Sequence, residues 1–109
     1  MTKKAGIISI FGVPYEVTVE DSIGDGGTRM GETCYSDRWI KIHSGMRRDH
    51  VLSTIGHEIG HEVLNEGGAL SALSDDQQEI ACNVAGKVAE IMFNQPEIIE
   101  KIVRLSAKK

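Results

Sequence analysis

His57, Glu58 and His61 form the pattern H-E-x-x-H within the segment STIGHEIGHEVLNE, residues 53–66. On an α-helix, residues four positions apart project from the same side, so the two imidazoles can bind one metal ion. A glutamate beside them can take a proton from a metal-bound water as that water attacks a carbonyl group. The pattern therefore predicts zinc-dependent hydrolysis of a peptide bond, with His57 and His61 as ligands and Glu58 as general base.

Hydrolytic zinc sites usually have three protein ligands, and a water molecule takes the fourth position. The best candidate for the third ligand is Glu79, in the helical segment LSDDQQEIACNVAGKVAEIM, residues 73–92. Asp75 and Asp76, earlier in the same segment, are the alternatives. Asn83 follows Glu79 by one turn, and we expect it to hold a ligand histidine by a hydrogen bond to the second ring nitrogen.

The helix that carries the motif begins at about residue 47, where the hydrophobic residues take up a helical period. Gly56 and Gly60 each lower the helix propensity by roughly 1 kcal/mol relative to alanine, so we expect another backbone to approach closely there. The opposite side is apolar and is predicted to face a sheet: Leu52, Ile55, Ile59 and Val63. The next helix has a stripe of mainly small residues that can lie against the first: Cys82, Asn83, Gly86 and Ala89.

The residues before this helix predict strands and turns. The segments GIISIFG (6–12) and PYEVTVE (14–20) contain β-branched residues in partial alternation, which predicts two neighbouring strands. The glycine-rich run SIGDGGTRMGE (22–32) predicts a mobile loop with little that can form a core. The segment ETCYSDRWIKIHSG (32–45) predicts two short strands around a turn at Ser36 and Asp37. The second of these strands has one face with Ile40 and Ile42 and another with Trp39, Lys41 and His43.

Two further helices are predicted after the motif. One covers residues 74–93 and begins at the cap Ser74-Asp75, and a shorter one follows Pro96, where proline suits a first turn. The sequence therefore predicts one α+β domain over residues 1–109. Its small, twisted sheet, antiparallel or mixed, has three to four strands and is followed by the three helices.

The remaining polar residues are assigned more ordinary places. We expect His50 to be solvated in the first helical turn, and Glu62 and Glu66 to form a solvated face near the helix end. Cys34 is expected to be a half-buried strand cysteine, with a zinc-blocking role as the alternative. Tyr35 and Trp39 are predicted to be packing or rim residues, and His43 a polar strand residue. Tyr35 and His50 remain open as second donors to an oxyanion.

Composition narrows the classes of function. The formal net charge is -4, and no basic patch of the kind that binds nucleic acid is present. No apolar run reaches the roughly 20 residues that span a bilayer, so no membrane partner is expected. The opening MTKKAGIISIFGVPYEV is expected to be a strand and not a signal peptide. Cys34 and Cys82 are then expected to be free thiols in a reducing cytoplasm.

The chain resembles the small zincin-like metallopeptidases, especially short phage and prophage proteins related to the ImmA/IrrE group, and also the minigluzincins. The resemblance covers nearly the whole chain, through FGVPYEV, GETCYSDRWIKIHSG, TIGHEIGHEVL and LSDDQQEIACNVAGKVAEIMFNQPE. It implies a twisted sheet beside an active-site helix, with His57 and His61 as zinc ligands and Glu58 as general base. It also implies a glutamate third ligand, usually within E-x-x-A, whereas Glu79 is followed by Ile80-Ala81-Cys82.

The resemblance further implies a protein or peptide substrate, bound along the exposed sheet edge formed by residues 31–43. A rival hypothesis is a non-catalytic zinc-binding interaction protein, for example a phage product that binds a host factor. A short domain gains stability from bound zinc, which gives the rival a physical basis. The sequence leaves the oligomeric state open.

Overall fold

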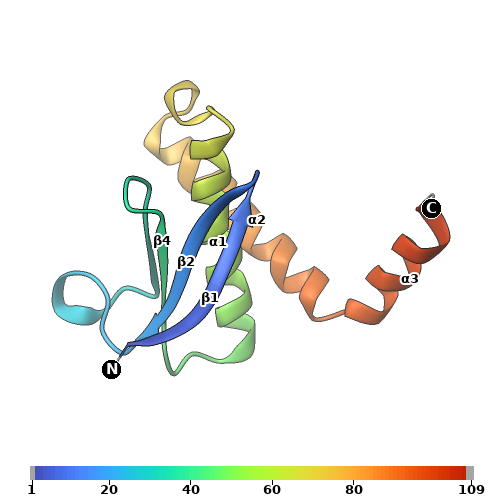
Figure 1. The fold of residues 1–109 in the computed structure, drawn as a ribbon, viewed down its shortest axis with the longest axis horizontal. Coiled ribbons are helices and arrows are strands. Elements are labelled where there is room, and N and C mark those ends of the chain that lie inside the picture. The colour runs from blue at the N-terminus through green and yellow to red at the C-terminus, as the bar shows by residue number, and fades with distance from the viewer. Residues whose placement is uncertain (1, 108–109) are drawn as a thin grey trace.

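The computed structural model describes residues 2–107, with a four-stranded sheet followed by the helices (Figure 1). The strands are β1 (Lys3–Ile10), β2 (Val13–Glu20), β3 (Gly31–Cys34) and β4 (Trp39–His43). They lie in the order β1-β2-β4-β3, with β2 and β4 parallel and the other two pairs antiparallel. The predicted α+β class, the mixed sheet and the turn between β3 and β4 are confirmed, and β3 forms one edge.

The core lies between one face of this sheet and the first long helix, α1 (Arg48–Glu66). The alternation of β4 places its isoleucines inward and its other residues toward solvent, as predicted. Ile55 and Ile59 of α1 pack against this core, whereas Val63 is largely exposed. The buried cluster consists of Ile10, Tyr15, Val17, Ile40 and Ile42.

The loop between β2 and β3 is more ordered in its contacts than the sequence predicts. Ile23 is buried, so the expectation that this run adds little to a core is wrong at this position. Its carbonyl accepts a hydrogen bond from the Arg29 N–H at 3.1 Å, and the His43 N–H donates to the Met30 carbonyl at 2.8 Å. A short 3₁₀ turn, η1 (Asp25–Gly27), lies between these contacts.

The second long helix, α2 (Asp75–Phe93), packs closely against α1, and a 3₁₀ turn, η2 (Leu70–Ala72), connects them. A Cβ atom on Gly56 would lie 2.8 Å from the Ala85 carbonyl oxygen and 2.9 Å from the Gly86 Cα. At Gly60 it would lie 3.3 Å from the Cys82 Cα. The predicted close backbone approach is therefore confirmed, and Gly56 is the tighter of the two positions.

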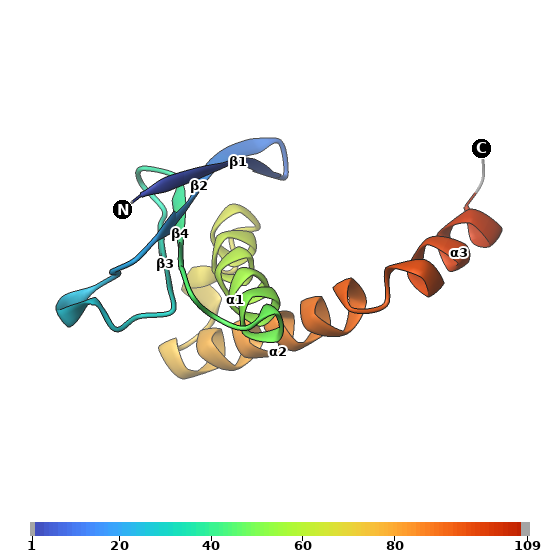
Figure 2. The same ribbon diagram turned by 90° about the horizontal axis from the view of Figure 1, so that it is seen from below.

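Helix α2 begins with a capping box, in which Ser74 Oγ accepts from the Gln77 N–H and the Gln77 side chain accepts from the Ser74 N–H. The last helix, α3 (Pro96–Ser106), extends away from the α1–α2 pair in both ribbon views (Figures 1 and 2). None of the described helices combines the length and apolar character that crossing a bilayer requires.

Candidate metal centre

His57, His61 and Glu79 converge where α2 crosses α1. The two Nε2 atoms are 3.1 Å apart, and the Glu79 carboxylate lies 3.4 Å from His57 Nε2 and 3.2 Å from His61 Nε2 through its two oxygens. One donor atom from each residue lies within 4.8 Å of the others. The helical spacing of the histidines and the close glycine contacts together produce this convergence.

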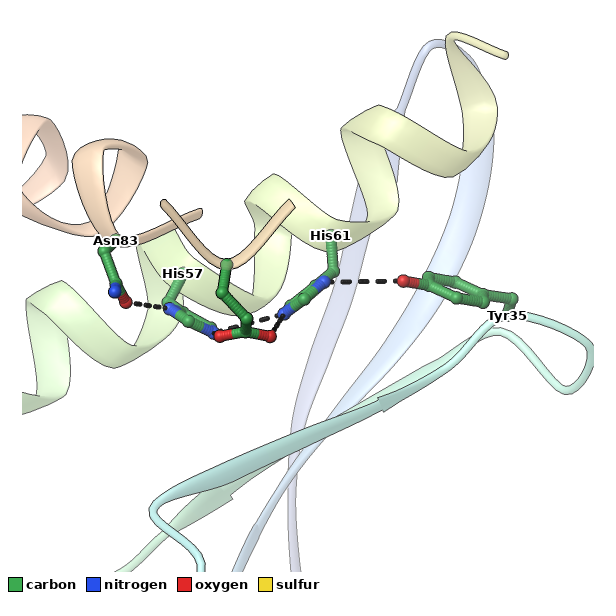
Figure 3. Close-up of polar contacts among 5 residues, drawn as sticks. Tyr35, His57, His61 and Asn83 are labelled. Carbon is green, nitrogen blue, oxygen red and sulfur yellow. Dashed lines mark hydrogen bonds and ion pairs between the residues drawn. The ribbon is translucent and has the colours of Figure 1, made fainter. Parts of the chain in front are cut away.

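Each histidine has a polar neighbour at its other ring nitrogen (Figure 3). Asn83 Oδ1 lies 2.9 Å from His57 Nδ1, and Tyr35 Oη lies 3.4 Å from His61 Nδ1. Because an amide oxygen only accepts, His57 Nδ1 must carry the proton, which leaves the Nε2 lone pair directed toward the cluster. The predicted contact between Asn83 and a histidine is thus present, and it is made to His57.

The three side chains form a donor set that suits a divalent cation. Two imidazole lone pairs and a carboxylate face one another, and such a group lacks internal charge compensation unless a proton or cation lies among them. A tetrahedral zinc site with bonds of about 2.0–2.1 Å has neighbouring ligand atoms roughly 3.3–3.4 Å apart. The observed separations are 3.1, 3.2 and 3.4 Å, and the last two reach different oxygens of Glu79. With one donor atom from each residue the three lie within 4.8 Å, so the group has a size and chemistry that fit one divalent cation such as zinc.

Burial lowers the pKa of His61, and the neighbouring His57 lowers it further. His61 is therefore held in the neutral form that binds metals. Burial also raises the pKa of the Cys82 thiol to about 11, with Glu79 and Glu58 adding to the shift. Cys82 thus remains a protonated packing residue beside the cluster, because a thiol binds metal as the thiolate.

Glu58 of α1 lies against Gly31, the first residue of β3, and lines the same cavity as the cluster. Its side chain is 7% exposed, and a Cβ atom on Gly31 would lie 3.0 Å from both its Cγ and its Oε2. Burial raises the pKa of Glu58 to about 7, and the negative charges of Glu79 and Glu32 raise it as well. A cavity of about 310 Å³ is lined by Glu58, by the three convergent residues and by β3.

The alternatives for the third ligand lie elsewhere. Asp75 and Asp76 are exposed in the first turn of α2, and the cluster among the described residues contains Glu79 and neither aspartate. Cys34 is half-buried as expected, and its sulfur lies 3.5 Å from Ser36 Oγ. The structure therefore brings the first choice, Glu79, to both histidines.

Two other histidines are outside the cluster. His50 is exposed in the first turn of α1, as predicted. His43 is half-buried on β4, where its Nδ1 lies 2.6 Å from the Ser44 carbonyl oxygen. Trp39 is also half-buried, with Lys41 Nζ 4.3 Å from its ring centre.

The prediction for Glu62 is wrong. Its side chain is 0% exposed, packed on the sheet side of α1 near Tyr15 and Thr33. Neither carboxylate oxygen makes a well-formed hydrogen bond to a described residue. Burial raises the pKa of Glu62, while the Tyr15 and Thr33 hydroxyls partly offset that shift. The residue lies one position after His61, so its side chain is directed away from the two histidines and toward the sheet. The helical pattern of the sequence alone predicts that this side faces solvent.

Tyr35 is the site residue whose role the sequence conceals. It lies in the turn between β3 and β4, 26 positions before its partner His61. Only the sheet order, which makes β3 the edge strand beside α1, brings that turn to the end of the motif. An aromatic residue in a tight turn next to a predicted edge strand is the available signal, and it does not indicate the histidine.

Comparisons with known proteins give no match to this chain. No protein-family model matches the chain, no curated protein matches its sequence, and no solved structure matches its fold.

Proposed function

We propose that the chain is a zinc-dependent peptidase with His57, His61 and Glu79 as metal ligands and Glu58 as general base. The observation that carries the proposal is the convergence of two imidazole Nε2 atoms and a carboxylate, whose oxygens lie 3.2 and 3.4 Å from the two imidazole nitrogens. The hydrogen bond between His57 Nδ1 and Asn83 supports it, because a ligand histidine normally donates its other N–H to such a neighbour.

Each residue has a separate task in this proposal. Bound zinc would supply a Lewis acid that polarises the scissile carbonyl and acidifies a water molecule. Glu58, buried beside the ligands, accepts the proton of the attacking water and donates it to the leaving amine. Asn83 and Tyr35 orient the two imidazoles from behind, which keeps both Nε2 atoms directed into the site.

An extended peptide is the substrate class that the surroundings favour. Strand β3 is an edge of the sheet and lines the cavity that contains Glu58. A peptide that pairs with β3 by strand addition would pass in front of the ligands with its carbonyl groups regularly spaced. We propose the cytoplasm as the compartment, since Cys34 and Cys82 are both free thiols.

Metal analysis and cleavage assays together test the proposal. The purified protein should bind one zinc ion per chain, and His57→Ala or Glu79→Ala should remove it. The zinc-loaded protein should create new termini in a peptide library, detected by mass spectrometry. Glu58→Gln should retain zinc and fold but lose at least about 100-fold in cleavage rate, consistent with the usual contribution of a general base.

Glu66→Gln is the matched control, because it makes the same chemical change at the partly exposed end of the same helix. Its cleavage rate should equal that of the wild type. Stoichiometric zinc with no cleavage by the wild-type protein would support the rival hypothesis, in which the metal stabilises a non-catalytic interaction protein. Undiminished zinc in the Glu79→Ala variant would exclude the ligand set.

A further inference from the structure

An apolar groove lies beside the cavity of the candidate metal centre. Its volume is about 790 Å³, which is within the range of roughly 300–1,000 Å³ typical of ligand sites. Its walls come from α1, α2 and the loop before β3. A contiguous exposed apolar patch with polar neighbours indicates a binding surface. The apolar side chains that line the groove have exposed fractions of 47–64%: Met30, Ile80, Val84, Val88 and Ile91.

The groove is continuous with the cavity that contains the proposed catalytic residues. Four residues line both: Arg29, Gly31, His57 and Glu58. Of the three proposed metal ligands, His61 and Glu79 line the cavity but not the groove. The groove therefore begins at the general base and leads away from these two ligands.

The cationic side chains that line the groove already have acidic partners. Lys87 Nζ lies 3.4 Å from Glu90 Oε2, and Arg29 Nη1 lies 3.5 Å from Glu32 Oε2. An acidic substrate side chain would also meet the carboxylate of Glu58 at the end of the groove. Because a charged side chain gains no free partner among these groups, its transfer from water to this apolar surface costs free energy. The groove therefore favours apolar side chains over charged ones.

The groove is long enough for two substrate side chains. Its end near the site is marked by Asn83, which contacts His57, and Val88 and Ile91 lie about 8 and 12 Å further along the axis of α2. In an extended peptide, which advances roughly 3.3 Å per residue, side chains on one face are about 6–7 Å apart. One side chain can therefore lie near Val84 and the next on the same face near Val88 and Ile91.

We propose that this groove binds the segment that follows the scissile bond, through bulky aliphatic or aromatic side chains at its first and third positions. The inference rests on the proposed peptidase function. In that function Glu58 donates a proton to the leaving amine, so the residue that supplies this amine lies on the groove side of the bond. The substrate class is thus an extended peptide with alternating apolar residues after the cleavage point, and Val84, Val88 and Ile91 determine the specificity.

Peptide binding tests this assignment without cleavage. The zinc-loaded Glu58→Gln protein is titrated with a short polar peptide that contains one leucine-serine-leucine segment, and with versions in which serine replaces either leucine or both. The methyl NMR signals of Val84 and Val88 should shift on addition of the first peptide. Each replacement by serine should weaken binding roughly 10-fold, because one side chain then remains in water.

Cleavage of the same peptides by the zinc-loaded wild type tests the orientation. Mass spectrometry should show a new amino terminus at the first leucine of the segment. Serine at the first or at the third position should each lower kcat/KM roughly 10-fold.

Val88→Asp and Ile102→Asp form a matched pair of variants. The two side chains are aliphatic and are 49% and 51% exposed, but Val88 lines the groove and Ile102 lies on α3. Val88→Asp should remove the preference at the third position and leave the preference at the first. Ile102→Asp should change neither, and both variants should retain zinc. Val88→Ala, which keeps a good helix former, should weaken the third-position preference, and circular dichroism should show that all three are folded.

Three results would overturn the inference. They are equal binding of the leucine and serine peptides, equal effects of Val88→Asp and Ile102→Asp, and a Val88 methyl signal that Ile102→Asp shifts without peptide. The last result would show that α3, of the same chain or of a second copy, fills the groove.

The outcomes also separate this inference from the proposed function. Cleavage without a preference for leucine would reject the groove assignment and support the peptidase. Binding that depends on both leucines, with no cleavage by the wild type, would reject the peptidase and support the groove as a site for alternating apolar residues.

Discussion

The α1–α2 pair and α3 differ in how their residues are packed. Where α1 meets α2, glycines allow the backbones to approach, and a hydrogen-bonded set of polar residues fills the crossing. Helix α3 has larger apolar residues and a stronger amphipathic pattern, yet none of its residues is buried. Close packing thus follows from small residues in register on two helices, whereas a strong apolar stripe identifies only a surface that requires a partner.

The largest expected effect is that zinc stabilises one of these regions and not the other. Metal at about 100 times its dissociation constant stabilises the native state by about 2.7 kcal/mol, which slows amide exchange through unfolding roughly 100-fold. We expect this protection across α1 and α2. The exchange rates of the α3 amides should not change, because no residue of α3 belongs to the group of His57, His61 and Glu79.

Hydrogen exchange with and without zinc measures this difference. Both measurements should use the same low protein concentration, so that self-association does not contribute. If zinc protected the amides of α3 as much as those of α2, α3 would have to unfold together with the α1–α2 pair. That result would contradict the contrast between the two regions.

The next largest expected effect is the change in the free energy of unfolding when Gly56 is replaced by alanine. Alanine gains roughly 1 kcal/mol of helix propensity, but its Cβ would lie 2.8–2.9 Å from backbone atoms of α2, which cannot move as a side chain can. Overpacking of this kind costs about 1–3 kcal/mol, so after the gain in propensity Gly56→Ala should lower the free energy of unfolding by up to about 2 kcal/mol. Denaturant titration measures it.

Gly60→Ala is the matched substitution, because its nearest contacts are at 3.2–3.4 Å. Its free energy of unfolding should stay within about 1 kcal/mol of the wild type, because the propensity gain offsets a small adjustment. If Gly56→Ala proves as stable as Gly60→Ala, the close approach is not a requirement of the fold.

The comparison also shows which features a sequence can supply. The spacing of His57 and His61 and the small residues of α2 are local patterns, so the convergence of the candidate residues and the helix pair could both be predicted from them. Sheet order is not local. The parallel pairing of β2 with β4 makes β3 the edge, and this brings Tyr35 to His61.

Burial on the sheet side of α1 was equally hard to predict. A glutamate near a helix end is usually solvated, and Glu62 differs because Tyr15 and its strand lie over it. Likewise, Ile23 is surrounded by glycines and polar residues in sequence, so its burial depends on how the loop itself folds. Neither burial can be read from a local pattern.

Removal of the Asn83 side-chain amide, which contacts His57, should have a free-energy effect similar to or slightly smaller than that of Gly56→Ala. The effect should appear as a loss of metal affinity. Removal of a residue that orients a ligand histidine typically lowers affinity 10–100-fold. Asn83→Ala should have this effect, because its Oδ1 lies 2.9 Å from His57 Nδ1. Val84→Ala, at the next residue, whose side chain is exposed, should leave affinity unchanged. Competition with a zinc chelator measures both, and equal losses would show that Asn83 acts only through the stability of α2.

The buried carboxylate of Glu62 lowers the stability of the otherwise well-packed region around α1. Because its folded-state pKa is raised above the unfolded value of 4.5, ionisation opposes folding as the pH rises through the interval between them. Glu62→Gln should therefore raise the free energy of unfolding at pH 7 by about 1 kcal/mol, the lower end for a buried unsatisfied group. The gain should disappear below about pH 4.5, where the wild-type carboxyl is protonated in both states.

Thermal unfolding of the protein with a metal chelator present measures this gain without a contribution from zinc. Glu66→Gln serves as the control, since Glu66 is partly exposed at the end of the same helix. Its stability should change little at either pH. A loss of stability in Glu62→Gln at pH 7 would show that the charged form makes a favourable interaction with Tyr15 or Thr33.

The smallest expected effect lies in α3. Leu105 is 74% exposed, so Leu105→Ala should change the free energy of unfolding by less than about 0.5 kcal/mol in dilute solution. The same deletion of aliphatic carbon at the buried Ile40 should cost about 2–5 kcal/mol. A large cost of Leu105→Ala in dilute solution would mean that α3 already packs within its own chain, and the contrast between the two regions would then be removed.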